Sequence, residues 1–218
     1  SVLVPVLIER GVPLALLGTS APAANLNIIS RSDSGDIAIP FKGGMPDMIY
    51  RSLSHDPDMR RYTVRYTATP VEAMQLFMTG DVAAAFLAEP LSTLLTERAP
   101  STVHTRDLCT HWRAVHRVAH CAATGAYVAT GLPADALLQV RQALAAAVES
   151  VSAQPTVAAM LIRTAFPSLR QAPLERAFGR LSPAFQPTCP SQWLRQTLDI
   201  LSPFAPFSTA QGTIPLAC

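Results

Sequence analysis

Hydrophobic and polar residues follow two different periods over the first 130 positions of the chain. Short apolar runs of strand length lie at 14–17, 36–41 and 82–87, and the run 61–66 alternates apolar with polar residues. Between these runs, apolar residues recur at helical spacing. Strands that alternate with helices are typical of βαβ units, which build a parallel sheet with helices on its faces. The pattern therefore predicts an α/β fold.

Residues that begin or end helices mark several helix boundaries. Thr69 stands directly before Pro70 and three residues before Glu72, which combines an N-cap, a first-turn proline and a capping-box glutamate. We expect Gly80 to end this helix. Further helices are predicted at 47–53, 91–98, 134–152, 155–165 and 173–181. Residues 202–218 have no clear period and predict an irregular segment.

The composition is that of a globular protein with few charges. Of 218 residues, 49% are hydrophobic and 15% are charged. The first apolar stretch, 2–17, is interrupted by Glu9, Arg10 and two prolines, so it falls short of the ~20 apolar residues that a spanning helix needs. No transmembrane segment is predicted. The chain lacks an initiator Met and a basic leader, which indicates that a signal peptide has been removed or that the chain is truncated.

The positive charges are spread along the chain and do not predict a polyanion partner. Lys and Arg number 17 and the formal net charge is +2, without a run of five basic residues, so nucleic-acid binding is not expected. The four cysteines, Cys109, Cys121, Cys189 and Cys218, form no CxxC pair. They would make two disulfides in an exported protein or stay as buried thiols in a cytosolic one.

Prolines open three of the predicted helices, each directly after a strand and a short turn. These are Pro46, Pro70 and Pro90. In parallel α/β sheets such turns lie together at the carboxyl edge of the strands, where helix N-termini present unpaired N–H groups. We therefore expect a ligand to bind at this edge.

Three motifs, in their order along the chain, resemble the solute-binding proteins of ABC importers for nitrate, sulfonate, taurine and thiamine-precursor compounds. They are residues 37–47 (IAIPFKGGMPD), 68–73 (ATPVEA) and 80–90 (GDVAAAFLAEP). Ala83 stands where the family frequently has Asp. A looser similarity extends from Val2 to the end of the predicted helix 134–152.

The resemblance implies a type II periplasmic-binding-protein-like fold, with two lobes that close on a small molecule. Each lobe would be a parallel-rich sheet flanked by helices. We expect residues 1–35 to belong to lobe 1, residues 36–122 to form lobe 2, and residues 123–218 to return to lobe 1 with C-terminal helices. Because family members begin earlier, we expect further residues before this sequence. A measured intact mass near 23.3 kDa would contradict that expectation.

Lys42, the only lysine, lies between a predicted strand end and a glycine turn that opens a helix. With the N–H groups of Gly43, Gly44 and Met45, it would form an anion site at the helix N-terminus. The alternative is a solvated loop lysine. Asp47 opposes an anion by its charge unless it turns away or pairs with Lys42, which leaves a zwitterion or a neutral polar compound as cargo.

Other polar residues are expected to face the same crevice. Thr19 and Ser20 end one predicted strand, Thr69 follows another, and Glu89 closes a third. Thr69 has the alternative role of a plain N-cap. Glu89 would bind a ligand amine or hold the loops of the lobe together. The resemblance adds Pro5 to these expected ligand contacts.

Residues 109–121 contain three histidines and two cysteines. His116 and His120 would share a face of a helix and, with a cysteine, hold Zn²⁺. However, the spacing fits no standard zinc pattern, and the resemblance places a strand start near this segment. A Cys109–Cys121 disulfide and ordinary loop residues are the alternatives. The other two cysteines would then form a second bridge.

No catalytic motif is visible: the chain has no nucleophile elbow, Walker loop, zinc-protease motif or dinucleotide fingerprint. This absence favours binding over turnover, and the resemblance implies a non-enzymatic, cofactor-free solute-binding component of an ABC importer, which captures a small polar or anionic molecule. It would be an exported monomer, periplasmic or on the cell surface, with a membrane permease as partner. An enzyme on the same scaffold and the effector domain of a LysR-type regulator are the alternatives. Product formation would favour the enzyme, and an upstream helix-turn-helix the regulator.

Overall fold

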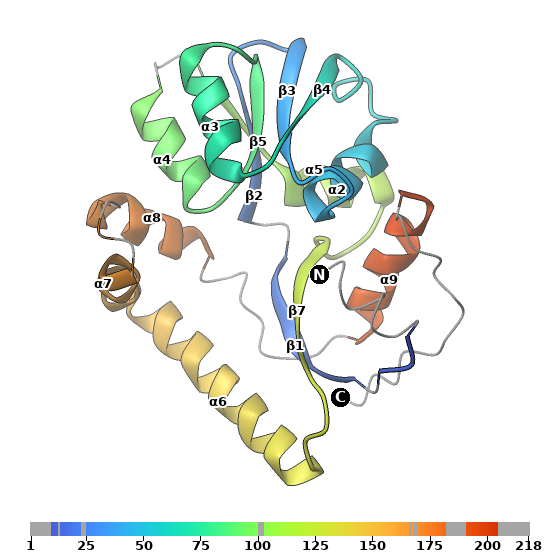
Figure 1. The fold of residues 1–218 in the computed structure, drawn as a ribbon, viewed down its shortest axis with the longest axis vertical. Helices are drawn as coiled ribbons and strands as arrows, with labels where there is room; N and C mark the ends of the chain where they lie inside the picture. The colour runs from blue at the N-terminus through green and yellow to red at the C-terminus, as the bar shows by residue number, and fades with distance from the viewer. Residues whose placement is uncertain are drawn as a thin grey trace.

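The computed structural model describes residues 10–12, 14–22, 25–99, 103–165, 167, 170–181 and 191–204. These residues form a larger unit around a five-stranded sheet and a smaller unit around a two-stranded sheet (Figure 1). The predicted α/β class is confirmed.

The five-stranded sheet has the order β4-β3-β5-β2-β6. Its strands are β2 (Leu26–Ser30), β3 (Gly35–Pro40), β4 (Tyr62–Thr67), β5 (Ala84–Ala88) and β6 (His104–Asp107). β3 pairs in parallel with β4 and β5, whereas β2 runs antiparallel to both β5 and β6. β2 thus lies inside this sheet, although the sequence had suggested that residues 1–35 belong to the other lobe. The reason is that β2 follows β1 of the smaller unit in the chain but pairs antiparallel with β5 and β6 of the larger sheet.

Helices cover both faces of this sheet. The helices of the larger unit are α2 (Met45–Leu53), α3 (Pro70–Thr79), α4 (Leu91–Arg98) and α5 (Leu108–His116). One core cluster packs α3 and α4 against strand residues that include Ile29, Ala38 and Leu87. The other packs α2 and α5 against residues that include Ile37, Ile39 and Phe86. Because both faces of the inner strands β2, β3 and β5 are covered, these three strands are largely apolar without alternation, whereas the edge strands β4 and β6 are not.

The predicted helix start at Thr69 is confirmed in detail. The Thr69 hydroxyl accepts a hydrogen bond from the Glu72 N–H at 3.1 Å, and Pro70 is the first residue of α3. The Glu72 carboxylate accepts the Ala68 N–H at 2.8 Å. Gly80 ends the helix with φ +85°, in the left-handed region that favours glycine.

The smaller unit consists of two strands and the C-terminal helices. They are β1 (Ala15–Pro22), β7 (Ala123–Ala129), α6 (Ala134–Ala153), α7 (Pro155–Ala165), α8 (Gln171–Leu181), α9 (Ser191–Leu201) and the short 3₁₀ helix η3 (Ser202–Phe204). β1 and β7 pair antiparallel. β1 continues through residues 18–20, where the sequence predicted its end, because backbone pairing with β7 extends the strand.

Helix α9 is hydrogen-bonded to the segment of the chain that leads from the larger unit into β7. Trp193 Nε1 donates a hydrogen bond to the Cys121 carbonyl, and the Ala123 N–H donates to Thr197 Oγ1 at 3.1 Å. At the other side of the molecule, Arg176 of α8 donates to and pairs with Glu97 of α4. The two units are therefore tied together at the strands and at one pair of helices.

The long helix α6 has no buried residue among those described. Its predicted apolar face is half-buried and consists of Leu137, Val140, Leu144, Val148 and Val151. Leu138 on α6 and Leu161 on α7 are exposed. No single helix among the described residues has the length and apolar character to cross a membrane, and α6 and α7 pass that test only as a pair bent by 105°.

Candidate ligand-binding edge

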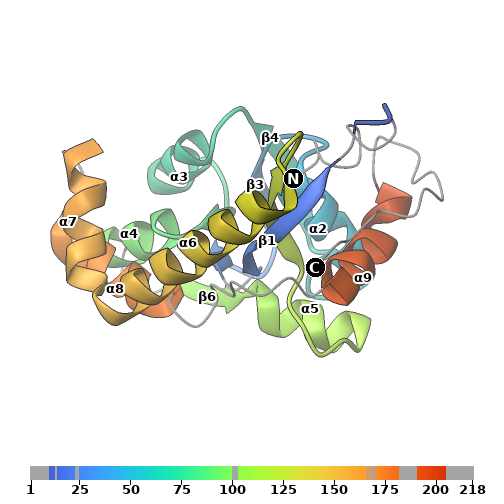
Figure 2. The ribbon, with the colours of Figure 1, turned by 90° about the horizontal axis from the view of Figure 1, so that it is seen from below.

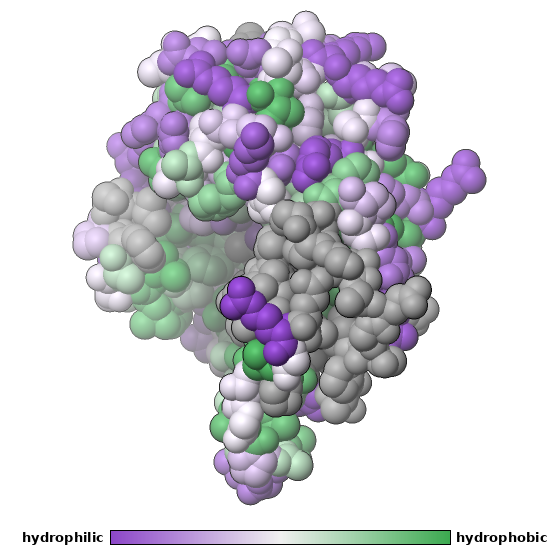
Figure 3. Space-filling view, turned by 45° about the vertical axis from the view of Figure 1, so that its right-hand side comes forward, coloured by the Kyte–Doolittle hydropathy of each residue, from purple (hydrophilic) through white to green (hydrophobic). Residues whose placement is uncertain are grey.

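The carboxyl ends of β3, β4, β5 and β6 lie at one edge of the five-stranded sheet, which we call the carboxyl edge. β2 starts at the same edge, because its first residue, Leu26, pairs with Ala88 at the end of β5. The edge faces the smaller unit (Figure 1), and β1 and α6 lie in front of it when the molecule is seen from below (Figure 2). Figure 3 shows a hollow beneath the larger unit, and hydrophobic side chains lie on its side away from the viewer.

A fixed turn follows β3 at this edge. The Phe41 N–H donates to the Thr67 carbonyl at 3.0 Å, and the Phe41 carbonyl accepts the Gly44 N–H at 2.7 Å. Phe41 adopts a φ of +61°, a conformation that costs a non-glycine residue about 1–3 kcal/mol. A Cβ on Gly44 would lie 2.8 Å from the Phe41 carbonyl oxygen, so only glycine fits there. The turn therefore holds an aromatic residue in an unfavourable backbone conformation.

The Asp47 carboxylate is turned inward, below the turn, and is only 2% exposed. It accepts the Gly43 N–H at 2.8 Å and the Tyr66 hydroxyl at 2.9 Å, and it pairs with Arg51 Nε at 3.4 Å. The N–H groups of Gly43 and Gly44 are thus engaged inside the protein. The anion site expected on these groups lacks two of its predicted donors, while Lys42 keeps its position at the edge.

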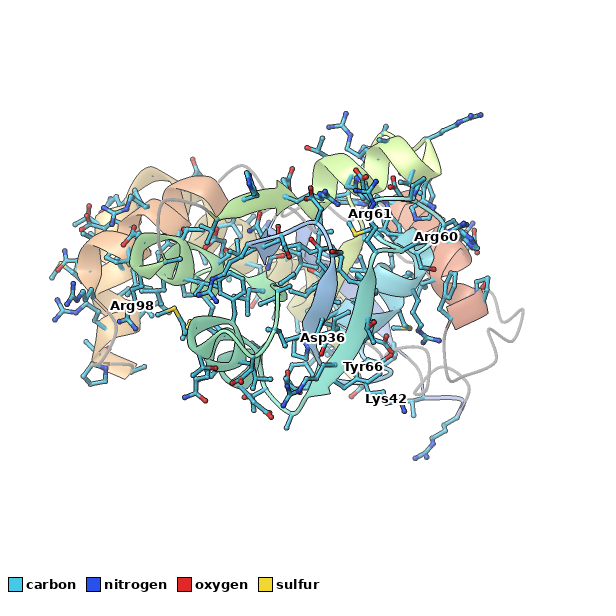
Figure 4. All side chains as sticks on the ribbon, turned by 90° about the horizontal axis from the view of Figure 1, so that it is seen from above. Asp36, Lys42, Arg60, Arg61, Tyr66 and Arg98 are labelled. Carbon is cyan, nitrogen blue, oxygen red and sulfur yellow. A yellow bond between two sulfur atoms is a disulfide. The ribbon has the colours of Figure 1, made fainter. Side chains whose placement is uncertain are left out.

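Lys42 and Tyr66 lie side by side at the carboxyl edge (Figure 4). The exposed Lys42 places its Nζ 5.4 Å from the centroid of the Tyr66 ring. Burial raises the pKa of the Tyr66 hydroxyl above its usual value, and the hydrogen bond to Asp47 raises it further. Tyr66 is therefore a neutral donor to Asp47 at physiological pH, with its ring beneath an ammonium group.

Two other predicted contacts lie at the same edge but have structural partners. Thr69 caps α3, which is the alternative role considered for it. Glu89 is half-buried; its carboxylate accepts the Thr93 N–H at 3.1 Å, and its own N–H donates to the Asn25 carbonyl at 2.8 Å. Glu89 thus joins the β5–α4 turn to the start of β2. The ligand contacts of both residues remain predictions.

The remaining predicted contacts lie elsewhere. Thr19 and Ser20 are within β1, where they pair with Ala126 and Gly125 of β7. Pro5 lies outside the described residues. Met45 is the first residue of α2. The structure therefore gathers Lys42, Thr69 and Glu89 at one edge, with Thr19 and Ser20 on the strand that leads from it.

The sequence did not single out Phe41, Tyr66 and Arg51 as parts of this edge. Phe41 had a local signal, since it lies at the end of a predicted strand and is followed by the polar and glycine residues of a turn, where side chains are usually exposed. Tyr66 and Arg51 had none, because their meeting with Asp47 depends on how β4 and α2 pack.

Cys109 and Cys121 form a disulfide, with Cα atoms 4.8 Å apart. It joins the first turn of α5 to the segment before β7. Cys189 and Cys218 lie outside the described residues. The bridge is one of the three alternatives considered for residues 109–121.

The three histidines of this segment contact different partners. His111 Nε2 lies 3.3 Å from an Asp56 oxygen, and the His116 ring packs on Trp112 with centroids 4.3 Å apart. The His120 ring lies beside Trp193. Within the part of the chain that the structure describes, no three His, Cys, Asp or Glu residues are grouped as metal ligands. The arrangement gives no support to a zinc site.

Stability should fall in mild acid because of two of these histidines. Burial lowers the pKa of His111, although Asp56 opposes the shift; burial also lowers that of His116, with His111 and His55 adding to it. Below about pH 6.5, the unfolded chain therefore binds more protons than the native one, and each histidine removes at most about 1.4 kcal/mol per pH unit. Above that pH, their contribution is complete.

Urea denaturation between pH 7.5 and pH 5 checks this expectation. The double variant His111→Asn/His116→Asn should lose less stability over this interval than the wild type. The exposed Ser34 supplies the control, since Ser34→Ala removes no ionisable group and should leave the slope unchanged. Parallel pH profiles for all three proteins would contradict the expectation.

No protein-family model matches the sequence, and no curated protein sequence matches it. Solved structures do match. A crystal structure described as an ABC transporter from Parabacteroides distasonis matches with a TM-score of 0.80 at 18% identity, over 99% of this chain and 76% of that one. The periplasmic aliphatic sulphonate-binding protein SsuA from Escherichia coli matches with a TM-score of 0.65 at 15% identity, over 94% and 69%.

The alkanesulfonate-binding protein SsuA from Xanthomonas axonopodis pv. citri, bound to MOPS, matches with a TM-score of 0.56 at 17% identity, over 89% of this chain and 68% of that one. At such low identities the likeness defines the fold. This chain has a periplasmic-binding-protein-like fold, as the sequence predicted.

Proposed function

We propose that this protein is the solute-binding component of an ABC importer and captures a small polar or anionic molecule between its two units. The observation that carries the proposal is the carboxyl edge with Lys42, Thr69 and Glu89, which opens toward the smaller unit. In open α/β sheets, ligands bind in the crevice outside this edge. The structural likeness to sulphonate-binding proteins supports the same role.

Closure of the two units would give the protein its affinity. A ligand favours a closed state only by contacts that it makes there and not in the open state. The connections from β1 to β2 and from α5 to β7 would serve as the hinge, because the chain passes between the units at these two places. We propose that the protein binds its solute without chemical change or cofactor and delivers it as a monomer to a membrane permease.

The disulfide supports export. Disulfides form and persist in the periplasm and outside the cell and are rare in the cytosol. The Cys109–Cys121 bridge is therefore consistent with a periplasmic or cell-surface protein. This compartment is the one in which a solute-binding protein meets its cargo.

Removing the charges of Lys42 and Glu89 should weaken the binding of taurine, which carries an ammonium and a sulfonate group, at least tenfold, since each charged hydrogen bond to a ligand contributes about 1.5–3 kcal/mol. Nitrate, which has no ammonium group, should lose only the contribution of Lys42. The variant is Lys42→Ala/Glu89→Gln, because the glutamine oxygen can still accept the Thr93 N–H. Isothermal titration with nitrate, taurine and MOPS measures the affinities, and circular dichroism checks the fold.

The opposite edge of the same sheet offers a matched control. Asp36 and Arg61 are an exposed acid and an exposed cation near the amino ends of β3 and β4 (Figure 4). Asp36→Ala/Arg61→Ala should leave affinity unchanged. Equal affinity in the Lys42/Glu89 variant and in the wild type would contradict this assignment of the site.

A further inference from the structure

Two exposed aromatic side chains lie at the carboxyl edge. Phe41 is 49% exposed and Tyr66 37%, and they are the only aromatic residues among the exposed large hydrophobic residues of the described chain. Phe41 directly follows β3 and Tyr66 lies in the neighbouring strand β4, and the Phe41 N–H donates to the carbonyl of Thr67, the residue after Tyr66. Exposed aromatic residues grouped at a crevice are typical of ligand-binding surfaces.

Both residues are held in place before any ligand arrives. The Phe41 backbone is bonded on both sides and closed in by Gly44, so its ring has only side-chain torsions left. The Tyr66 ring is fixed at its far end by the hydrogen bond to the buried Asp47. Rigid aromatic side chains lose little entropy on binding, which makes them efficient contacts for a flat ligand.

The placement of the charges, rather than their sum, favours an anion at Lys42. Lys42 and Arg51 contribute two positive charges and Asp47 and Glu89 two negative charges, and the Glu89 carboxylate, at the end of the neighbouring strand β5, accepts the Thr93 N–H. The Asp47 charge is buried and hydrogen-bonded, whereas the Lys42 ammonium is exposed above the Tyr66 ring. A ligand at the edge therefore meets the ammonium and the rings before it meets the Asp47 carboxylate.

We propose that the solute recognised at this edge is a planar aromatic anion, whose ring packs on Phe41 and Tyr66 and whose charge pairs with Lys42. This inference rests on the proposed function and narrows it to a ligand class. Stacking supplies selectivity for a flat ring over a puckered one of equal size, and the ammonium supplies selectivity for the anion over a neutral molecule of the same shape.

Isothermal titration with four simple probes tests the two selectivities separately. Benzoate should bind about fivefold to tenfold more tightly than cyclohexanecarboxylate, which has the same charge but no flat ring. It should also bind at least tenfold more tightly than benzamide, which has the same shape but no charge. Acetate, which carries the charge without a ring, should bind most weakly.

Variants should remove one selectivity at a time. Phe41→Asn retains a residue that tolerates the left-handed backbone and should abolish the preference for benzoate over cyclohexanecarboxylate. Tyr66→Leu should weaken that preference, whereas Tyr66→Phe, which keeps the ring, should retain it. Lys42→Gln should abolish the preference for benzoate over benzamide, and Lys42→Arg should retain it. Met78→Asn, at an exposed residue of α3, should change neither preference.

The outcomes separate this inference from the function on which it rests. If nitrate, taurine or MOPS binds through Lys42 and Glu89 while benzoate and cyclohexanecarboxylate bind equally well, the solute-binding function stands and the aromatic class is overturned. If the four probes differ as expected but Phe41→Asn changes nothing, the position of the site is overturned. If no solute of either set binds, both proposals are overturned.

Discussion

Asp47→Ala is expected to lower the free energy of unfolding by about 2–4 kcal/mol. The substitution removes a buried carboxylate and leaves the Gly43 N–H, the Tyr66 hydroxyl and Arg51 without it. A donor left unsatisfied in a buried place costs about 1–3 kcal/mol. Because the same carboxylate fixes Tyr66 and the turn before α2, ligand affinity should fall as well. Urea denaturation and isothermal titration measure the two effects.

Two further variants make this expectation specific. Asp47→Asn keeps an acceptor oxygen and should lose less stability than Asp47→Ala. Asp33→Ala makes the same chemical change at an exposed loop residue and should have little effect. In a double-mutant cycle with Tyr66→Phe, Asp47→Ala should show coupling, since the two side chains are hydrogen-bonded. An equal, small effect of Asp47→Ala and Asp33→Ala would contradict the account of the turn.

Removing the Cys109–Cys121 disulfide is expected to cost about 3 kcal/mol, because the bridge closes a short loop and restricts the unfolded chain. For a chain of this length the melting temperature should fall by roughly 6–12 °C. The double variant Cys109→Ala/Cys121→Ala measures the effect by calorimetry. The loss should exceed that of a surface change, since Cys109 is buried and the bridge anchors the segment that enters β7.

Ala119→Ser changes an exposed residue inside the same loop and should leave the melting temperature unchanged. A reductant should lower the melting temperature of the wild type toward that of the double variant. Equal melting temperatures for the double variant and the wild type would show that the bridge contributes nothing to stability.

Helices with local signals could be predicted from the sequence. Thr69, Pro70 and Gly80 fix the ends of α3 by hydrogen bonds and backbone conformation within a few residues. The bounds of α4 and α7 also agree with the prediction. These features depend on neighbours along the chain, which a sequence displays directly.

Elements that depend on distant partners could not be predicted. β6 reads His-Thr-Arg-Asp, without an apolar pattern, and is a strand because β2 pairs with it. Two missed helices did carry local signals: Asp107 caps α5, and α9 has the amphipathic spacing of Trp193, Leu194 and Leu201.

The candidate site was predicted only in part. The strand–turn–helix motifs predicted that Lys42, Thr69 and Glu89 lie at one edge, because parallel strands end on the same side of a sheet. The Asp47 carboxylate points inward, where it accepts a hydrogen bond from Tyr66, 19 residues away. Local spacing could not predict that this carboxylate faces away from the ligand side. The sequence therefore indicated the edge, and tertiary packing determines its chemistry.

The central claim is that the protein captures a small solute between its units. Native mass spectrometry of the protein purified without added ligand tests this claim most directly. We predict a second mass peak, displaced by one small molecule, that disappears after unfolding and refolding and is absent from Lys42→Ala/Glu89→Gln. A single peak at the mass of the chain alone, together with no uptake of nitrate, taurine, MOPS or benzoate after refolding, would contradict the claim.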